Sequence, residues 1–363
     1  MAKNWKYREE GKKISKSVIQ SKSTEELIQA RGFIETLLNL RKLEKLYKTY
    51  IKGTSKAIKY NERHKVFMSF NLDGTTTGRL SCTGYSGNEG NNMGISFHTL
   101  PRDKEHNIRD MFVAPEGWDF ITADYSAMEL RVLAHIADEK NMKEAFTQGK
   151  DLHTYTASLV FNKAESKVTK QERQIAKAVS FLIVYGGGPF NLSETMDISL
   201  RRAEKIIDQY AKVYPGVFKY MSRVNAAIEE DGYITTIFGR RRNLPDVKSN
   251  VFKIKNRALR QGLNFTVQSA ASDVLVCAVL GIVETLKKRR LEAKFQATVH
   301  DSLEFICPKT ETREVCDIIK DEMVNCNYMK KNLNLILDIP LCIDLEVGSS
   351  FGDGKPYEYT TSN

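Results

Sequence analysis

The sequence predicts an α+β protein with a small antiparallel sheet. Three observations support this class. Long segments with helical spacing fill the centre of the chain, a short apolar strand candidate spans 118–123, and residues 296–307 alternate between apolar and polar side chains. The order along the chain is a helical arm, a strand and helix, a long helical block and a strand hairpin, which is typical of helices segregated from an antiparallel sheet.

The length of the chain indicates its number of domains, and its charge distribution indicates the kind of molecule it binds. Its 363 residues suffice for about two domains, and its charged fraction of 28% is that of a globular protein. Residues 1–60 carry 15 basic and 6 acidic side chains, a net charge of +9, whereas the other 303 residues carry 40 and 39, a net charge of +1. This basic block favours a polyanion such as nucleic acid, because Lys and Arg displace counterions from phosphates. The alternative is a solvated arm that aids solubility.

Neither a membrane span nor a disulfide framework is predicted. The sequence has no run of 18 apolar residues, and its first ten residues are charged rather than apolar as a secretory signal requires. Its six cysteines form no CxxC pair. We interpret them as reduced thiols of an intracellular, cytoplasmic protein rather than as zinc ligands.

The first predicted element is a basic amphipathic helical arm. Residues Ser23 to Glu26 have the pattern of a capping box, and apolar residues then recur at helical spacing as far as Tyr50. Gly32 is a candidate break in this helix and Gly53 a candidate end. The alternative interpretation is an ordinary surface helix.

The remaining elements follow in order. Residues 84–94 are rich in Gly and Asn and predict a loop, and Trp118 to Ala123 predicts a strand that leads into Asp124. The polar triplet 300–302 predicts the tip of a hairpin within 296–307. Helices are predicted over 125–147, 170–185, 199–213, 216–230, 253–289 and 311–326.

Two carboxylates stand where predicted strands end. Asp124 follows the strand 118–123, and Asp301 lies at the predicted hairpin tip. If both reach the same sheet edge, they can hold two Mg²⁺ ions, which activate a 3′-hydroxyl and stabilise a pyrophosphate leaving group. The alternative is that each carboxylate caps a turn or a helix.

One predicted helix face combines cations with aromatic rings. Arg173, Lys177, Phe181 and Tyr185 are spaced four residues apart, which keeps them on one side of the helix. Cations hold a triphosphate, and an aromatic ring one or two turns later can lie against a base or sugar. The alternative is that the aromatic residues belong to the core and the cations are solvated.

Together these pieces resemble the motifs of family A DNA polymerases, the bacterial DNA polymerase I type. The resemblance covers roughly residues 23–350, and its motifs occur in the family's order. Its A motif is similar to Asp124–His135, its B motif to Arg173-x3-Lys177-x3-Phe181-x3-Tyr185-Gly186 and its C motif to Val299-His300-Asp301, with two DNA-contacting segments similar to Thr77–Ser81 and Arg260-x3-Asn264-x3-Gln268.

The resemblance implies a role for each matching residue. Asp124 and Asp301 are implied metal ligands, with the Tyr125 carbonyl as a further contact. Lys177 is an implied triphosphate ligand and proton donor to pyrophosphate. The other implied nucleotide contacts are Arg173 at the triphosphate, Phe181 at the sugar and base, Tyr185 near the template base, Glu129 under the sugar 2′ position and His153 near the β-phosphate.

The resemblance also implies contacts with the primer-template. Five residues would contact the minor groove, where acceptor positions are similar for all base pairs. Reading these positions checks pair geometry without a sequence preference. The implied DNA contacts are Arg79, Arg260, Asn264, Gln268 and His300.

The chain departs from the family pattern at several positions. The family usually has Glu directly after the C-motif Asp, where this chain has Ser302; Glu304 shares a strand face with Ser302 and is a candidate to compensate. Residues 97–101 replace the family's Leu-Gln-Asn-Ile-Pro segment and follow a Gly- and Asn-rich insertion.

The resemblance implies a right-hand polymerase: a palm with a small antiparallel sheet, helical fingers and a reduced helical thumb. The expected boundaries are 1–70 for the basic arm and reduced thumb, 71–139 and 250–363 for the palm, and 140–249 for the fingers. Because only 76 residues precede Thr77, we expect no proofreading exonuclease in this chain. We also expect a partner polypeptide that completes the thumb and supplies the exonuclease.

The expected function is template-directed extension of a DNA primer 3′-hydroxyl with dNTPs, using two Mg²⁺ ions, as suits a phage or mobile element. Three alternatives remain at this stage. The chain is the catalytic half of a split polymerase, a non-catalytic subunit that binds primer-template, or an RNA-synthesising polymerase, against which Glu129 argues.

Overall fold

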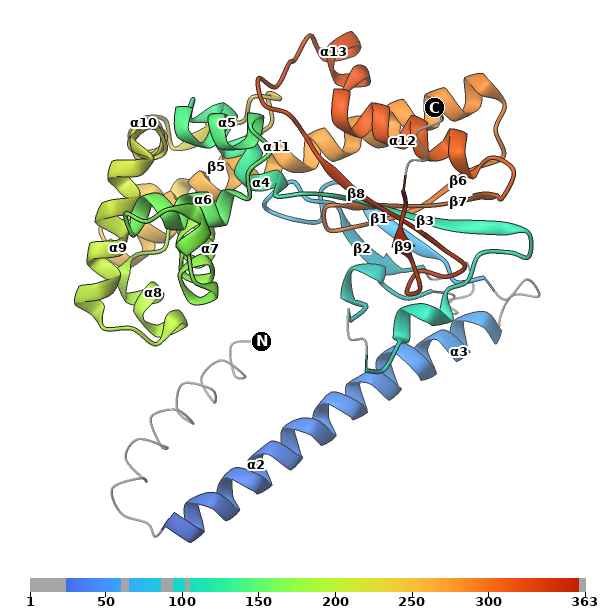
Figure 1. Ribbon diagram of the computed structural model, residues 1–363, viewed down its shortest axis with the longest axis horizontal. Coiled ribbons are helices and arrows are strands. Elements are labelled where there is room, and N and C mark those ends of the chain that lie inside the picture. The colour runs from blue at the N-terminus through green and yellow to red at the C-terminus, as the bar shows by residue number, and fades with distance from the viewer. Residues whose placement is uncertain (1–23, 60–64, 86–93, 102–104, 359–363) are drawn as a thin grey trace. The chain divides into compact units, whose positions relative to one another are not determined.

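The computed structural model describes residues 24–59, 65–85, 94–101 and 105–358, with the side chains of 24–31 excepted. Figure 1 shows the chain coloured from its N-terminus to its C-terminus. The chain divides into two compact units. Unit 1 comprises residues 1–69 and 83–96, and unit 2 comprises 70–82 and 97–363. This division does not test the finer boundaries of palm and fingers.

Unit 1 contains a long helix that does not stop at its glycines. The backbone stays helical through α2 (Thr24–Lys45), the π-helical turn η1 (Leu46–Ile51) and α3 (Lys52–Lys59). The predicted break at Gly32 and end at Gly53 are therefore wrong. A glycine inside a helix costs only about 1 kcal/mol relative to alanine, which uninterrupted backbone hydrogen bonding outweighs. The predicted capping residue Ser23 lies outside the described residues.

The predicted strand and hairpin of unit 2 are confirmed. Strand β3 spans Trp118–Tyr125, and the hairpin consists of β6 (Lys294–Val299) and β7 (Ser302–Pro308). They belong to a five-stranded antiparallel sheet of order β6-β7-β3-β8-β9, completed by β8 (Ile343–Gly348) and β9 (Lys355–Pro356). The strands β1 (Met68–Asn71) and β2 (Ser81–Gly84) form a separate pair.

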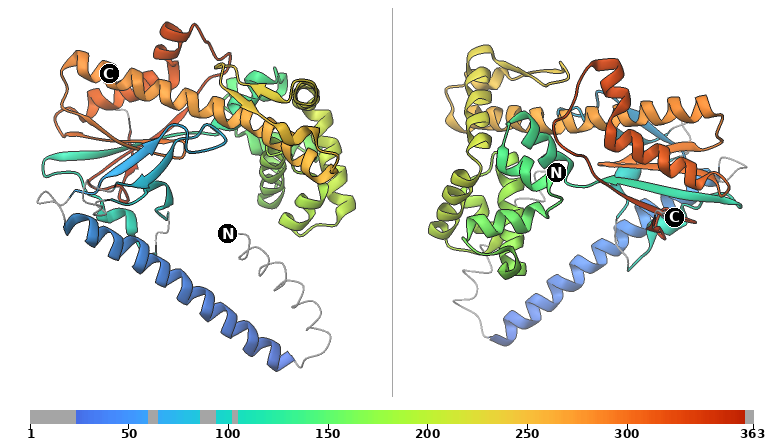
Figure 2. Two further views of the ribbon diagram at one scale, coloured as in Figure 1. Left: turned by 180° about the vertical axis from the view of Figure 1, so that it is seen from behind. Right: turned by 45° about the horizontal axis from the view of Figure 1, so that its top comes forward.

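The two faces of the five-stranded sheet differ in polarity. On one face Ile121, Ala123 and Leu303 are fully buried, and helices α11 (Phe252–Arg289) and α12 (Thr312–Asn325) run along the sheet (Figure 2). The register places polar side chains together on the opposite face of β7, β3 and β8. They are Ser302, Glu304, Thr122, Asp124, Asp344 and Glu346.

A helical block follows β3. The predicted helix 125–147 is two helices, α4 (Met128–Ile136) and α5 (Lys140–Thr147), because Asp138 between them adopts a positive φ of 47°. The predictions for 170–185, 199–213 and 216–230 are confirmed within two residues. The elements of this block are α6 (Leu152–Val160), α7 (Lys170–Val184), α8 (Pro189–Met196), α9 (Leu200–Val213), α10 (Pro215–Asp231), β4 (Tyr233–Thr235) and β5 (Arg241–Asn243).

Short elements complete the described chain. Helix α13 (Asn327–Leu333) follows α12, and the remaining elements are single 3₁₀ turns. These turns are η2 (Phe97–Thr99), η3 (Ile108–Met111), η4 (Glu165–Lys167) and η5 (Pro245–Lys248).

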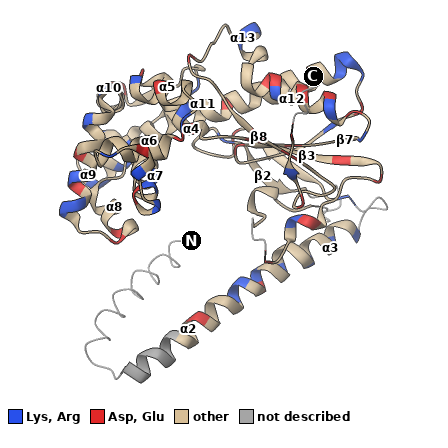
Figure 3. Ribbon diagram, viewed as in Figure 1, with Lys and Arg blue, Asp and Glu red and all other residues tan. Residues whose placement is uncertain are grey.

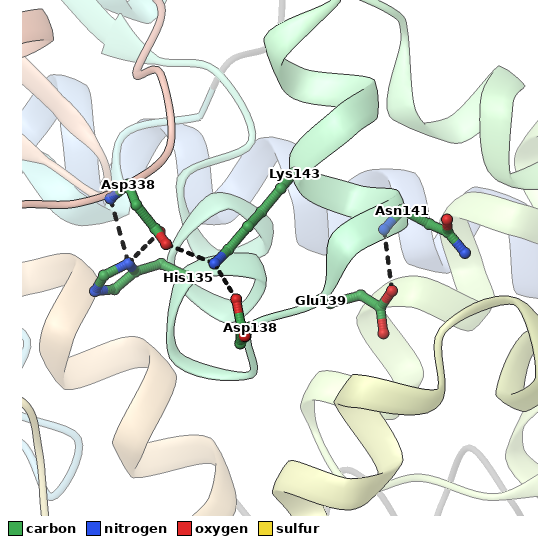
Figure 4. Close-up of polar contacts among 6 residues, drawn as sticks. All are labelled: His135, Asp138, Glu139, Asn141, Lys143 and Asp338. Carbon is green, nitrogen blue, oxygen red and sulfur yellow. Dashed lines mark hydrogen bonds and ion pairs between the residues drawn. The ribbon is translucent and has the colours of Figure 1, made fainter.

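Polar contacts join α4 and α5 to the segment before β8 (Figure 4). The Asp338 carboxylate accepts from Lys143 Nζ at 2.6 Å and contacts His135 Nδ1 at 2.5 Å. The buried Glu139 side chain accepts from the backbone amides of Asn141 at 3.1 Å and Gly216 at 2.6 Å. These contacts hold the helix after Asp124 against both the sheet segment and the start of α10.

Helix α11 is long and apolar enough, by length and composition, to cross a membrane. In the described structure, however, 72% of its apolar window is buried within the protein. It is therefore a core helix of unit 2, and the helix predicted over 253–289 is confirmed. Four of the six cysteines, at 277, 307, 316 and 326, are buried in the core as predicted, whereas Cys342 is exposed.

Candidate active site

Nine of the predicted site residues line one pocket of unit 2. Its volume is about 670 Å³, and its walls come from β3, α4, α7, the β6–β7 turn and the segments around Arg79 and Arg109. The lining residues are Arg79, Leu100, Arg109, Asp124, Tyr125, Ala127, Met128, Glu129, Lys177, Phe181, Tyr185, His300 and Asp301.

The sheet register brings the two predicted metal-binding carboxylates together. Asp124 near the end of β3 pairs with Ser302, the residue that directly follows Asp301. The Tyr125 amide donates to the Asp301 carbonyl at 3.2 Å, which joins the hairpin tip to β3. His300 adopts a positive φ of 62°, so that the two-residue turn can close. The prediction that both carboxylates reach one sheet edge is confirmed.

The donor set in the pocket fits Mg²⁺. Asp124 and Asp301 supply carboxylate oxygens, and the Tyr125 side chain points away because its hydroxyl donates to the Met323 carbonyl at 2.8 Å. Only the Tyr125 backbone is therefore available to the pocket. Among the described residues, no group of three or more His, Cys, Asp or Glu forms a metal cage. Mg²⁺ commonly takes one or two carboxylates and completes its shell with water and phosphate oxygens.

Glu129 is buried and contacts two polar side chains that are themselves partly exposed. Its Oε1 accepts from Arg79 Nη2, and its Oε2 accepts from the Tyr185 hydroxyl at 2.9 Å. Arg79 also reaches Asp301 Oδ1 at 3.6 Å. Burial raises the pKa of Glu129, although Arg79, Tyr185 and Gln268 oppose the rise. Burial likewise raises the pKa of Tyr185 to about 12, so that this hydroxyl remains a donor at neutral pH.

The predicted face of α7 is divided between the pocket and the surface. Lys177, Phe181 and Tyr185 line the pocket, with the rings of Phe181 and Tyr185 stacked at 6.5 Å between centroids. Arg173 lies outside the lining and instead pairs with Asp151 through bonds of 2.7 and 3.0 Å. Burial alone would raise the pKa of Asp151. Hydrogen bonds from Arg173 and Thr154 outweigh this effect and hold the pKa below its usual range.

His153 on α6 contacts this face from the side. Its ring lies 6.1 Å from that of Phe181, and its Nδ1 is buried without a hydrogen-bond partner among the described residues. Burial lowers the pKa of His153 to about 4, helped by the nearby Lys177 and Arg173 and opposed by Asp151. The imidazole is therefore neutral at physiological pH.

The three predicted DNA contacts on α11 lie beside the end of α7. Gln268 is buried and hydrogen-bonds to Glu129 and Tyr185. Arg260 packs against Gly186, where an added Cβ would lie 2.6 Å from Arg260 Cγ. The Asn264 Oδ1 atom is buried and has no hydrogen-bond partner among the described residues. Arg260, Asn264 and Gln268 are not part of the pocket lining.

Arg109, which lines the pocket, and His98, which lies beside its lining residue His300, have no sequence pattern that would identify them. Arg109 lies in the single turn η3, donates to the carbonyls of Leu100 and Pro101, and stacks 4.4 Å above the Phe351 ring. His98 stacks on His300 at 5.9 Å between centroids, and its Nε2 contacts the Thr298 carbonyl at 2.9 Å. Only their position in the folded chain brings these side chains to the site.

Comparisons with known proteins agree with this geometry. The sequence profile of DNA polymerase family A matches residues 2–353. DNA polymerase I of Bacillus caldotenax is 36% identical over 333 residues, which are 91% of this chain and 36% of that protein. DNA polymerase I of Treponema pallidum is 35% identical over 327 residues, which are 90% and 31%. The chain thus spans about a third of the length of these relatives.

A solved structure has the same fold as this chain. It is the POL domain of Pol1 from M. smegmatis in complex with DNA primer-template and dNTP. The two chains superpose with a TM-score of 0.79 and 29% sequence identity. The match covers 91% of this chain and 55% of that one.

Proposed function

Since the chain belongs to DNA polymerase family A, we propose that it extends a DNA primer 3′-hydroxyl with dNTPs under the direction of a template. One observation carries the proposal. Asp124 and Asp301 meet at one sheet edge, beside a pocket lined by Lys177, Phe181 and Glu129. This pocket combines groups suited to metal ions, phosphate and sugar in a single volume.

Asp124, Asp301 and the Tyr125 carbonyl would hold two Mg²⁺ ions. When bound, such a pair activates the 3′-hydroxyl and neutralises charge on the leaving pyrophosphate. The protein's own contribution is to position the reactants and to stabilise charge. Lys177 would bind the triphosphate and donate a proton to the leaving pyrophosphate.

The other pocket residues would hold the nucleotide. Phe181 would pack against its sugar and base, and Tyr185 would lie near the template base. Glu129 would occupy the space of a 2′-hydroxyl and so exclude ribonucleotides. Arg173 would exchange its bonds with Asp151 for the triphosphate, and His153 would meet the β-phosphate with a neutral ring.

Primer-template DNA would lie across the residues around the pocket. Arg79, His300, Arg260, Asn264 and Gln268 would contact its minor groove. The Asn264 Oδ1 atom supports this role, because a buried amide oxygen without a partner is costly unless a ligand supplies one. A DNA substrate also implies that the protein acts inside the cell.

The proposed organisation follows the right-hand architecture. The palm would comprise 71–139 and 250–363, the fingers 140–249 and the reduced thumb 1–70. The proposal concerns primer extension alone.

Primer extension tests the proposed activity. Purified protein, a 5′-labelled primer-template and Mg²⁺ should give extension with dNTPs and much less with rNTPs. Asp301→Ala should abolish extension. Asp317→Asn, which removes one charge from an exposed position on α12, should leave it intact. If wild-type protein binds the DNA without extending it, the chain is either the catalytic half of a split polymerase that needs its partner or a non-catalytic primer-template binding subunit.

We further propose that a helix of a partner polypeptide covers α2 and completes the thumb. Five exposed apolar residues of α2 and η1 follow coiled-coil spacing: Phe33, Leu37, Leu40, Tyr47 and Ile51. Phe33 is 70% and Leu40 60% exposed, and the same helical stretch carries Lys42, Lys45 and Lys48. Figure 3 shows the basic positions along α2 in blue. The row therefore suits an amphipathic helix with acidic flanks.

Gel filtration with a designed peptide tests this partner surface. The peptide carries Leu at heptad positions a and d and Glu at the flanking positions. A one-to-one complex that Leu37→Glu/Leu40→Glu prevents would support the proposal. Failure of the wild-type chain to bind the peptide would contradict it.

A further inference from the structure

Strand β7 carries a fully buried carboxyl group next to the residues that would bind metal. Glu304 has no exposed surface, and it lies three residues after Asp301. Its Oε2 accepts from the Thr122 hydroxyl at 2.6 Å, and its Oε1 lies 2.7 Å from the Ser302 hydroxyl. A buried carboxyl group costs free energy unless its bonds are satisfied, and an apolar side chain would fill such a position at less cost. Its presence here calls for a functional explanation.

Glu304 and Ser302 share bonds with the turn that carries Asp301. The Ser302 hydroxyl lies 2.9 Å from the Val299 carbonyl as well as 2.7 Å from Glu304. A hydroxyl has only one hydrogen to donate. Both contacts are hydrogen bonds when Glu304 is protonated and donates to Ser302, which leaves Ser302 free to donate to Val299. The bonds of Ser302 to Glu304 and to the Val299 carbonyl then span the two-residue turn His300-Asp301.

The same carboxyl group also reaches the strand that carries Asp124. Thr122 lies two residues before Asp124 on β3 and directly opposite Glu304 in the register. Ser302 lies directly opposite Asp124. Glu304 therefore joins Ser302, which follows the proposed metal ligand Asp301, to strand β3, which carries the proposed ligand Asp124.

The surroundings raise the pKa of the Glu304 carboxyl group. Burial raises the pKa of Glu304 to about 7, with Asp124 adding to the rise and the Thr122 and Ser302 hydroxyls and Arg109 opposing it. Asp344 and Glu346 face the same side of the sheet from β8.

We propose that Glu304 is a positioning residue: through the hydroxyls of Ser302 and Thr122 it holds the turn bearing Asp301 in register with the end of β3 bearing Asp124. The inference rests on the proposed polymerase activity. Glu304 has no exposed surface and its oxygens are engaged by the two hydroxyls, so it acts through these neighbours rather than on substrate. Misplacing a catalytic group by about 1 Å can cost two orders of magnitude in rate.

Two substitutions of Glu304 separate positioning from packing. Glu304→Gln keeps an oxygen to accept from Thr122 and an N–H to donate to Ser302. Glu304→Met has a similar volume and makes neither bond. We expect kcat for single-nucleotide incorporation to stay within about threefold for Glu304→Gln and to fall by at least about tenfold for Glu304→Met. KM for dNTP should change little in both, because neither variant alters the nucleotide pocket.

A double-mutant cycle and a strand control complete the activity test. Ser302→Ala should lower kcat as Glu304→Met does. The double variant should be no slower than the slower single variant, because both substitutions break the same connection between Glu304 and the turn. Phe305→Leu alters a buried neighbour on the opposite face of β7. The Phe305→Leu variant should have a lower thermal unfolding temperature and keep kcat within about threefold of wild type. This result would show that looser packing of β7 is not sufficient to lower kcat.

Binding of Mn²⁺ provides a readout that does not depend on turnover. The electron paramagnetic resonance signal of free Mn²⁺ is titrated with protein, dideoxy-terminated primer-template and dNTP. We expect Glu304→Met to bind Mn²⁺ about tenfold more weakly than wild type and Glu304→Gln to match wild type. The inference is overturned if wild type extends primers and Glu304→Met matches it in kcat and Mn²⁺ binding. If folded wild type extends no primer under any condition, the proposed function fails instead.

Discussion

Glu129 is the residue whose surroundings most directly indicate substrate selection. Its carboxylate is 4% exposed and is held between Arg79 and Tyr185, so that it cannot swing away from the pocket wall. A side chain so constrained excludes a ligand atom by occupying its space. In the proposed function, one carboxylate and its two bonds would therefore exclude a 2′-hydroxyl.

Removing Glu129 should relax this exclusion. We expect Glu129→Ala to lower the preference for dCTP over CTP, expressed as a ratio of kcat/KM values, by at least about tenfold. The measurement is single-nucleotide incorporation opposite template G. Glu144→Ala on the exposed side of α5 is the control and should keep the wild-type ratio. An unchanged ratio in Glu129→Ala would contradict the assigned role.

His153 should make stability depend on pH. Because burial lowers its pKa from 6.5 to about 4, the unfolded chain binds a proton between these pH values that the folded chain does not. Stability therefore falls as the pH falls through this window. Between pH 7 and pH 4.5, wild type should lose about 2 kcal/mol more unfolding free energy than His153→Gln, measured by urea denaturation. Equal losses would show that His153 is not the titrating group.

The sequence identifies individual site residues only where local pattern decides their place. Asp124 follows a short apolar strand and Asp301 lies at the tip of an alternating hairpin, so local patterns predict where both stand, whereas their role as metal ligands rests on the family resemblance. The pairing of Arg173 with Asp151 could not be predicted, because the two residues lie on different elements that meet only after folding. The bonds of Glu304 likewise depend on the register between β7 and β3, which no local pattern specifies.

At the scale of elements, α7 begins with a reciprocal cap. The Thr169 hydroxyl accepts from the Glu172 amide at 3.2 Å, and the Glu172 carboxylate accepts from the Thr169 amide at 3.0 Å. Four backbone donors at a helix start lack partners within the helix, and this arrangement satisfies one of them together with the cap's own amide. The cap thus fixes the beginning of the helix that presents Lys177 and Phe181.

Removing the cap should destabilise the protein modestly. Thr169→Ala should lower the unfolding free energy by about 1 kcal/mol, measured by urea denaturation. Thr169→Ser keeps the hydroxyl and should stay within about 0.5 kcal/mol of wild type. An alanine variant as stable as the serine variant would show that the capping bonds contribute nothing measurable.

The predicted elements differ from the observed ones where packing or strand pairing with distant parts of the chain overrides the local sequence pattern. The helix 125–147 divides at Asp138, since α5 turns to pack beside α6 and α4 remains against α11. Strand β8 was not predicted, although Ile343, Leu345 and Val347 alternate with Asp344 and Glu346 as a half-buried strand requires. The six-residue pattern is too short to stand out until β3 pairs with it.

For the whole molecule, the distribution of charge matters more than the net charge of +10. Nearly all of the excess lies in the first 60 residues, including Lys42, Lys45 and Lys48. A basic segment on a DNA-binding protein makes affinity depend steeply on salt, because each phosphate contact releases a counterion. The strand order β6-β7-β3-β8-β9, by contrast, could not be predicted, since it depends on long-range pairing.

Primer-template affinity should therefore fall at least about tenfold between 50 and 200 mM salt. Replacing Lys42, Lys45 and Lys48 by Gln should flatten the plot of log affinity against log salt, measured by fluorescence anisotropy. Replacing Lys287, Lys288 and Arg289 by Gln at the far end of α11 removes the same charge and should leave the slope unchanged. A salt-independent affinity in wild type would contradict this prediction.

The central claim is that Asp124 and Asp301 act as one unit at the sheet edge. The most direct measurement is rapid-quench incorporation of a single dNTP by wild type, Asp124→Asn, Asp301→Asn and the double variant, with primer-template affinity measured in parallel. We predict that each single variant loses at least about a thousandfold in rate, that the double variant is little slower, and that DNA affinity is retained. A single variant with near-wild-type rate, or losses that multiply in the double variant, would contradict the claim.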